Sequence, residues 1–125
     1  MANNSILDIT KILNDYAKDI ANETTIESEI IAKRGVNELK TISPKKTGKY
    51  RKGWRSKTDK LKNDGVSIIY NATSYQLTHL LERPHATRNG GITTPKSAGH
   101  ISKVEQKINK EFENNVIKIV QNGGK

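Results

Sequence analysis

Three histidines and one glutamate are the side chains whose chemistry could serve a reaction: His79, His85, His100 and Glu82. The spacing of His79 and His85 does not match the i, i+4 spacing of a helical zinc pair. Pro84 would break a helix that held Glu82 and His85 together. The chain has no cysteine, and its sequence contains neither a phosphate-binding glycine loop nor a nucleophile elbow. We therefore predict no catalytic residue, no cofactor, no metal site and no enzymatic activity.

A basic segment is the stronger chemical signal. Residues 33–62 carry twelve Lys or Arg against two acids, which gives +10, whereas residues 1–32 carry two lysines against six acids, which gives −4. Such a block suggests an anionic partner, either nucleic acid or an acidic protein surface. A solvated face that the first helix partly neutralises is the equally weighted alternative. The predicted basic face, for DNA or an acidic partner, consists of Lys45, Lys46, Lys49, Arg51, Lys52, Arg55 and Lys57.

Two aromatic residues, Tyr50 and Trp54, lie among these cations. Aromatic side chains between positive charges can stack nucleic-acid bases. Trp54 is also the main candidate for the core, because only 5% of the residues are aromatic and burial of a tryptophan is strongly favourable. If Trp54 points inward, strand alternation turns Arg51, Arg55 and Lys57 to the opposite face. We favour this core position for Trp54, with a basic sheet face behind it.

The elements that position these residues fit one small domain, residues 1–125. Hydrophobic residues make up 33% of the chain, whereas roughly 45–50% is typical of globular proteins. We therefore expect a thin core, with neighbouring subunits supplying part of the burial. We expect no signal peptide and no membrane span, because no apolar stretch approaches the roughly 20 residues that a span needs.

Long amphipathic helices are predicted at both ends of the chain. Over residues 5–40, apolar residues recur at three- and four-residue steps, namely Ile6, Ile9, Leu13, Tyr16 and Ile20. The stripe shifts after Thr24, and Gly35 costs about 1 kcal/mol in a helix interior, so this region is either one bent helix or two. Pro44 ends it. Residues 101–121 form the closing helix, and Ser102 with Glu105 predicts a capping box at its start.

Between the helices the sequence predicts a small antiparallel sheet. Residues 50–59 and 66–72 have the composition of strands, and Asn63-Asp64-Gly65 between them predicts a hairpin turn, because these residue types tolerate positive φ. A short helix follows over residues 74–82.

Residues 83–100 are rich in glycine and proline and predict a flexible arm or loop. This arm either orders on assembly or contains a short strand near Ile92. The predicted fold class is α+β, with the long N-terminal and C-terminal helices packed on the hairpin 50–72 and the short helix 74–82.

Two stretches carry a resemblance to a known family. The first follows the predicted first helix and reads Ser-Pro-Lys-Lys-Thr-Gly-Lys-Tyr-Arg-Lys-Gly over residues 43–53, which fits the pattern (S/T)-P-x-x-T-G-x-(L/Y)-(R/K)-x-(S/G). The second runs from Val66 through Asn71 and Tyr75 to Glu82. With the order of elements over residues 5–121, they resemble the tail-completion or head–tail joining family of long-tailed bacteriophages, the minor neck proteins also called minor capsid proteins. The chain departs from that family where Arg-Pro-His follows Glu82 in place of a glycine and a short hydrophobic turn.

The resemblance implies a structural virion protein without catalytic residues, which forms an oligomeric ring, such as a hexamer, at the phage neck or the top of the tail. Its partners would be other copies of itself, phage neck proteins, tail-tube or tail-terminator proteins, and DNA if the basic face lines the channel. It would be located in the virion, and in the host cytoplasm during assembly.

The resemblance also gives expectations for single residues. The arm residues expected to contact a neighbouring subunit or partner are Arg83, His85, Arg88, Asn89 and Ile92. The motif residues would have structural roles: Pro44 would stop the first helix, Thr47-Gly48 would turn the chain into the sheet, Trp54 and Tyr70 would fill the core, Tyr75, Leu77 and Leu81 would pack the short helix, and Glu82 would mark the entry to the arm.

Two other functions stay open on the sequence. A basic nucleic-acid-binding module is favoured by the +10 segment with its two aromatic residues. A small basic ribonuclease that uses His79 or His85 with Arg83 or Arg88 is the weaker alternative, because no motif positions an acid–base pair.

Overall fold

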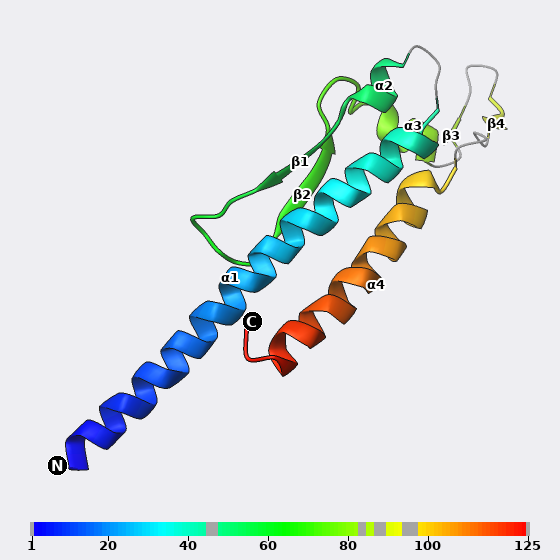
Figure 1. Cartoon of the computed structure of the whole chain (residues 1–125). Coiled ribbons are helices and arrows are strands. Elements are labelled where there is room, and N and C mark those ends of the chain that lie inside the picture. Colours follow the sequence, from blue (N-terminus) through cyan, green and yellow to red (C-terminus); the bar gives the residue numbers. More distant parts are fainter. Residues whose placement is uncertain (1, 45–47, 83–84, 87–89, 94–97, 125) are drawn as a thin grey trace.

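The computed structural model describes residues 2–44, 48–82, 85–86, 90–93 and 98–124. The element order is α1 (Ala2–Ile42), α2 (Lys49–Lys52), β1 (Trp54–Thr58), β2 (Ser67–Asn71), α3 (Leu77–Glu82), β3 (His85–Ala86), β4 (Ile92–Thr93) and α4 (His100–Gln121). The predicted α+β fold is confirmed: a long helix lies at each end of the chain, with a two-stranded antiparallel sheet and a short helix between them (Figure 1). The short strand predicted near Ile92 is present as β4.

α1 is the central element, because both the β1–β2 sheet and α4 pack against it (Figure 1). Residues 2–42 form one helix rather than two. Gly35 is accommodated within it because two neighbours approach closely there. A Cβ atom at this position would lie 2.9 Å from Cδ1 of Ile69 and 3.0 Å from Cδ1 of Ile108. The helix-propensity cost of glycine is therefore offset by the close approach of the sheet and α4.

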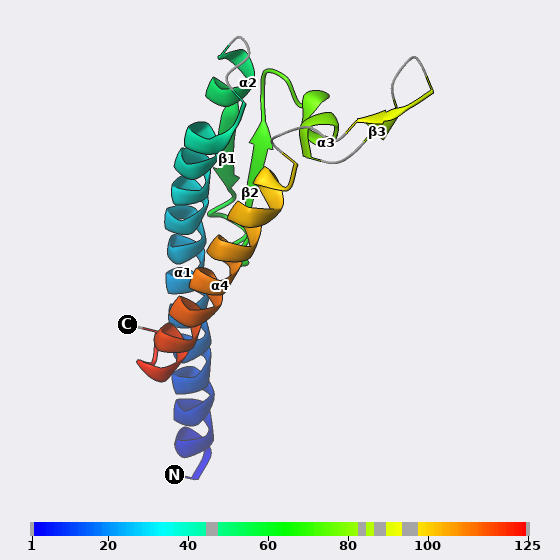
Figure 2. The same cartoon turned by 90° about the vertical axis from the view of Figure 1, so that its right-hand side faces the viewer.

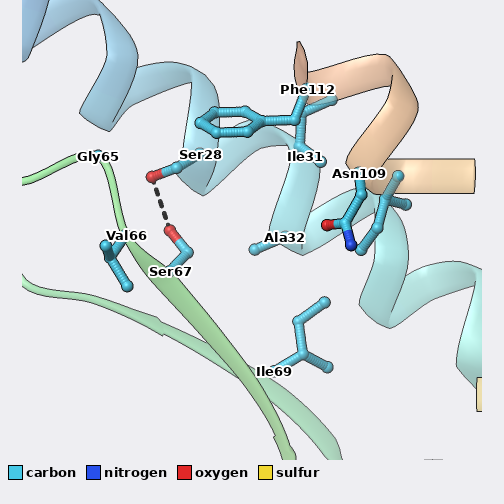
Figure 3. Close-up of a pocket in the computed structure, with 10 residues that line it drawn as sticks. Ser28, Ile31, Ala32, Gly65, Val66, Ser67, Ile69, Asn109 and Phe112 are labelled. Carbon is cyan, nitrogen blue, oxygen red and sulfur yellow. Dashed lines mark hydrogen bonds between the residues drawn. The ribbon is translucent and has the colours of Figure 1, made fainter. Parts of the chain in front are cut away.

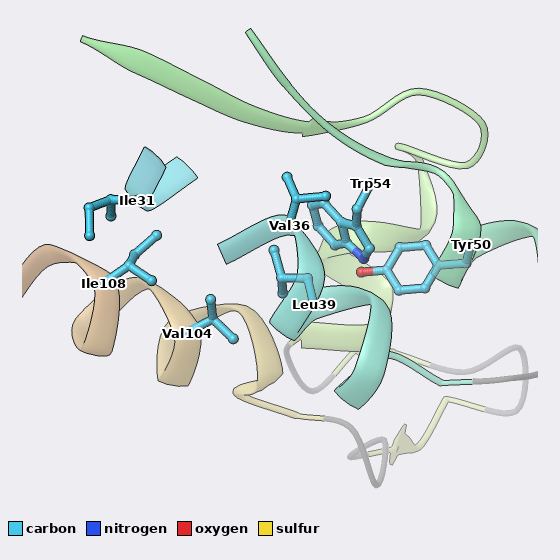
Figure 4. Packing of buried hydrophobic residues seen from close by; sticks show 7 residues of the cluster. All are labelled: Ile31, Val36, Leu39, Tyr50, Trp54, Val104 and Ile108. Atoms are coloured by element: carbon cyan, nitrogen blue, oxygen red, sulfur yellow. The ribbon is translucent and has the colours of Figure 1, made fainter. Parts of the chain in front are cut away.

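The buried core lies along the C-terminal half of α1, where the β1–β2 sheet and α4 both pack against this helix. The seven side chains of the cluster are Ile31, Val36, Leu39, Tyr50, Trp54, Val104 and Ile108 (Figure 4). Trp54 is 3% exposed and makes an edge-to-face contact with Tyr50, with ring centroids 5.5 Å apart. The prediction that Trp54 is a core residue is confirmed. Burial of this cluster removes apolar surface from water, which is the main favourable term in folding.

The hairpin prediction is also confirmed, with shorter strands than expected. β1 and β2 pair antiparallel, with Trp54 opposite Asn71 and Thr58 opposite Ser67. Asn63 and Gly65 adopt positive φ angles of 51° and 73°, which is the reason for these residue types in the turn. The turn is tied to α1, because the main-chain N–H of Gly65 donates to Oγ1 of Thr25 at 3.0 Å.

The expectation that three aromatic or apolar side chains would be packed inside the domain is wrong. Tyr70, Tyr75 and Leu77 are exposed and do not fill the core. Alternation along β2 turns Ile69 toward α1, so Tyr70 on the next position points to the outer face. Tyr75 precedes the short helix, which begins at Leu77 rather than at residue 74.

None of the helices in the described ranges has the length and apolar character needed to cross a bilayer.

Candidate interaction surface

The predicted basic face divides between two elements. Lys49 and Lys52 lie on the single-turn helix α2, whereas Arg55 and Lys57 lie on β1. The prediction of a strand from residue 50 is wrong for residues 50–52. Gly48 adopts a left-handed φ of 79°, and its carbonyl accepts a hydrogen bond from the N–H of Lys52 at 2.9 Å, which closes a helical turn. Of the predicted basic face, Lys45 and Lys46 lie outside the described residues.

Arg51 does not belong to the exposed basic face. Its Nε and Nη2 atoms donate hydrogen bonds to the carbonyl oxygen of Ser43, at 3.0 and 2.8 Å. Ser43 follows directly on the last turn of α1, where carbonyl groups lack helical partners. The guanidinium therefore fastens α2 to the end of α1, which is a structural role.

Arg55 and Lys57 form a cationic row on the outer face of the sheet, where Nη1 of Arg55 also donates to the carbonyl oxygens of Lys52 and Trp54, at 2.6 and 2.9 Å. Both side chains are exposed, and the strand register places Arg55 opposite Tyr70 and Lys57 opposite Ile68. Tyr70 and Ile68 are exposed on the same face. The sheet thus presents cations beside apolar side chains, on the side that points away from α1.

A neighbouring cation, Lys60, is paired with the first helix instead. Its Nζ atom lies 3.2 Å from a carboxylate oxygen of Glu29. Hydrogen bonds from Lys33 and then Lys60 hold the pKa of Glu29 below its usual value. The acidic first helix therefore neutralises part of the basic segment, as the sequence suggests, but it leaves Arg55 and Lys57 exposed.

Tyr50 and Trp54 are not available as a platform for nucleic-acid bases, because both are buried. Trp54 donates from Nε1 to Oγ of Ser43 at 2.8 Å, and Ser43 is 0% exposed. The hydroxyl of Tyr50 lies 2.8 Å from Nε2 of the buried His100. Burial raises the pKa of Tyr50 to about 12, and the carboxylate of Glu82 adds to this effect. The aromatic pair therefore joins the end of α1 to the start of α4.

Asn71 and Gly53, two further residues of the motifs, have structural roles. Asn71 is buried, donates to the carbonyl oxygen of Tyr50 at 2.8 Å and accepts from the N–H of Ser74 at 2.8 Å. Gly53 is packed so closely that a Cβ atom would collide with the side chain of Thr73 and lie 2.6 Å from Oδ1 of Asn71. Both residues hold the end of β2 against α2.

Glu82 fixes the base of the arm. Its carboxylate accepts hydrogen bonds from the N–H groups of Ile101, at 3.0 and 3.1 Å, and Ser102, at 3.2 Å. Its carbonyl oxygen accepts from the N–H of Gly99 at 2.9 Å. The predicted capping box is wrong, because α4 begins at His100 and its free N–H groups are capped from Glu82, distant in sequence. The expectation for Glu82 is thus sharpened: it joins the two ends of the arm.

The arm between these ends contains the β3–β4 pair, with His85 opposite Thr93 and Ala86 opposite Ile92. β3 lies away from the packed helices and the β1–β2 sheet (Figure 2). Ile92 is 80% exposed, so this predicted contact residue is open to a partner. The other predicted contacts, Arg83, Arg88 and Asn89, lie outside the described residues, as does the side chain of His85.

A hollow of about 240 Å³ lies between α1, β2 and α4 and is lined mainly by apolar side chains (Figure 3). Its two serines, Ser28 and Ser67, are hydrogen-bonded to each other at 2.8 Å. Ser28 also donates to the carbonyl oxygen of Thr25 at 2.7 Å, and Ser67 pairs with Thr58 at 2.6 Å. These hydroxyls therefore hold the sheet on α1. In the described part of the chain, no group of three or more His, Asp or Glu side chains is placed to hold a metal ion.

The N-terminal third of α1 is the surface that the sequence did not single out as exposed. α1 extends well beyond the C-terminal end of α4 (Figure 1). Ile9, Ile12 and Leu13 in this region are 58%, 65% and 61% exposed. The periodicity correctly gives an apolar helix face, but it does not show that none of the other described elements covers that face.

Comparison with protein-family models, with curated proteins and with solved structures finds no match to this chain.

Proposed function

We propose that this chain is a structural virion assembly protein of a long-tailed bacteriophage, which completes the tail or joins head to tail at the neck. Copies of the chain would form a ring and would contact neck proteins and tail-tube or tail-terminator proteins. The proposal rests on the resemblance carried by residues 43–53 and 66–82. It places the protein in the virion and, during assembly, in the host cytoplasm.

The observation that supports the proposal most is the convergence of the motif residues on one junction. Ser43 and Trp54 bond to each other, Asn71 holds α2, and Glu82 caps α4. These positions are separate in the sequence, yet together they fix the base from which the arm leaves the domain. The motif residues therefore hold in place the part of the domain to which the arm is attached. This role suits a protein that acts through contacts with neighbours.

The exposed apolar side chains support a function in protein–protein contact. Ile92 on the arm and Ile68 on the sheet are exposed, as are Ile9 and Leu13 on α1. Apolar side chains that cluster on the surface of a small domain mark interaction sites more often than single exposed residues do. Burial of these surfaces by neighbouring copies would also compensate for the thin core.

The test is electron microscopy of phage particles made without this protein. The proposal requires heads and tails that fail to join, or tails that lack a finished upper end. Complementation with Ile92→Asp should restore few joined particles, because a charge would be placed in an apolar contact of the arm. Leu61→Asp is the matched control, since Leu61 is 98% exposed in the hairpin turn. Intact, infectious particles in the absence of the protein would exclude the proposal.

A nucleic-acid-binding module is the second candidate, and the exposed cations Lys52, Arg55 and Lys57 favour it. With Tyr50 and Trp54 buried, binding would depend on phosphate contacts and would weaken steeply with salt. A gel-shift series with duplex and single-stranded DNA at low and moderate salt tests this function. Absence of a shift at low salt would remove it.

A further inference from the structure

The face of α1 that packs against α4 continues beyond the end of α4. Asn115 on α4 donates to Glu27 on α1 at 2.7 Å, and Tyr16 donates to the carbonyl oxygen of Val120 at 3.2 Å. Gly124 then lies against Asp19, after which α1 continues toward its N-terminus (Figure 1). Ile9, Ile12 and Leu13 extend this apolar row, and each is more than half exposed. A surface built to pack against another element is thus left open.

An acidic row borders this apolar row on one side. At about 3.6 residues per turn, Asp8, Asp15 and Asp19 share one flank of the helix, next to Ile12. All three are exposed. The two lysines of this region, Lys11 and Lys18, lie on the face turned away from the apolar row, next to the acidic row at i, i+3 spacing. The charges nearest the apolar row are therefore the acidic ones.

The outer face of the β1–β2 sheet has the complementary pattern. Its apolar row is formed by Val66, Ile68 and Tyr70, all exposed. Arg55 and Lys57 lie directly opposite Tyr70 and Ile68 in the strand register and form a parallel cationic row. This face also has a hollow of about 170 Å³, which lies between Lys57, Val66, Ile68 and the turn residues.

The two acids of that hollow, Asp59 and Asp64, are engaged in shaping the turn. Oδ1 of Asp59 accepts from the N–H of Leu61 at 3.0 Å, and Oδ1 of Asp64 accepts from the N–H of Val66 at 3.1 Å. They lie at the turn end of the sheet, away from Arg55. Lys57 and Lys62 line the same hollow as these two acids, so Arg55 is the cation of the row that lies away from them.

We infer that residues 8–19 of α1 in one copy of this chain dock on the outer face of the β1–β2 sheet in a second copy. The apolar rows would lie against each other, and the acidic row would lie along Arg55 and Lys57. This inference rests on the proposed function and deepens it, because it names the contact between neighbouring copies. The contact joins two different surfaces, so a pair leaves the sheet face of one copy and the α1 end of the other free. Further copies can add there, which generates a ring or an open filament.

Pairing of two α1 ends with each other fits the charges less well. In a symmetric antiparallel pair, the flanks that carry Asp8, Asp15 and Asp19 would lie on the same side of the contact. Like charges would then face each other, which is unfavourable. In a parallel pair, the acidic row would meet the opposite flank, where Thr10, Ala17 and Ala21 carry no charge. The sheet of a second copy, by contrast, offers both an apolar row and cations.

The experiment is sedimentation of the purified full chain over a wide concentration range, with three charge variants. Variant one is Asp8→Lys with Asp15→Lys and Asp19→Lys, and variant two is Arg55→Glu with Lys57→Glu. Each alone should show an apparent Kd at least about 10-fold weaker than the unaltered chain. An equimolar mixture of the two should associate again, because both types of contact between the variants become complementary. The control, Lys11→Glu with Lys18→Glu, alters the opposite helix face and should associate like the unaltered chain.

A cross-link keeps the inference testable if association is weak. The chain has no cysteine, so Leu13→Cys and Ile68→Cys chains, mixed under oxidising conditions, report this contact alone. They should form a mixed disulfide dimer, whereas Lys18→Cys with Ile68→Cys should not. Absence of both association and cross-link overturns the inference, as does association that variant two leaves unchanged. If either result is found while phage without the protein still fail to join heads to tails, the inferred contact between α1 and the sheet is wrong and the proposed function stands. If variant two loses only DNA binding, the sheet face serves nucleic acid instead.

Discussion

Replacement of Ser43 by alanine tests the buried junction from which the arm leaves the domain. Ser43 is 0% exposed, and its hydroxyl is the acceptor for Nε1 of Trp54, at 2.8 Å. Ser43→Ala removes this acceptor and leaves a gap too small for a water molecule. A buried donor without a partner costs about 1–3 kcal/mol. With a urea m-value of about 1.5 kcal/mol per M, a loss of 2 kcal/mol would lower the unfolding midpoint by about 1.3 M.

A double-mutant cycle with Trp54→Phe isolates this hydrogen bond from other effects of the substitution. In the Trp54→Phe chain, the Ser43 hydroxyl has lost its donor, so the further change Ser43→Ala should be almost neutral or slightly stabilising. The coupling energy should therefore be about 1–3 kcal/mol. Circular dichroism is the suitable readout, because Trp54 is the only tryptophan and fluorescence would be lost with it.

The control for this cycle is Thr41→Ala. Thr41 lies on the same last turn of α1, is exposed and donates to the carbonyl oxygen of Asn37 at 3.0 Å. Its replacement should change the free energy of unfolding by less than about 0.5 kcal/mol. Additive effects of Ser43→Ala and Trp54→Phe, within about 0.3 kcal/mol, would refute the role given to this hydrogen bond.

Two further predictions concern the same junction. Because burial raises the pKa of Tyr50 from 10.0 to about 12, the neutral phenol stabilises the folded chain below pH 10, and this contribution is lost as the pH rises through about 12. Tyr50→Phe should remove about 2 kcal/mol of this alkaline loss, and urea curves at pH 10 and 12 with the same difference in both chains would contradict the assignment. Glu82→Ala should destabilise the chain by about 1–2 kcal/mol, and Glu82→Gln by less, since an acceptor remains. Amide hydrogen exchange at Ile101 and Ser102 should accelerate in Glu82→Ala, and unchanged exchange would show that the carboxylate does not cap α4.

The long helices and the hairpin were predictable because their signals are local. The periodicity of apolar residues specifies α1 and α4, and the Asn-Asp-Gly turn specifies the hairpin through positive φ. The inward face of β2 was not predictable, because Ile68 and Ile69 are both apolar. A shift of one residue exchanges the two faces of a strand, so Tyr70 could be assigned to the core as readily as Ile69.

The interactions that the sequence did not predict are those between distant segments. The bond from Arg51 to Ser43 fastens α2 to the end of α1, and the carboxylate of Glu82 caps the start of α4. No local pattern distinguishes these residues from an exposed arginine or an arm residue. For the basic face, charge counting finds the segment, but the three-dimensional contacts decide that Arg51 is structural. Arg55 and Lys57 remain exposed, although Arg55 also donates to the carbonyl oxygens of Lys52 and Trp54.

The exposed end of α1 also bears on when the proposed assembly would occur. Helices that lack tertiary contacts are marginally stable in water, and α1 before Tyr16 extends beyond the end of α4 (Figure 1). Docking on a second copy would therefore have to order this segment as well as bury it, which lowers the net affinity of one contact. The copy that closes a ring, however, makes two such contacts, and a phage neck would hold neighbouring copies close together. Contacts of this kind favour a chain that stays dispersed until an assembly site gathers it, which is the behaviour needed in a component that is added late.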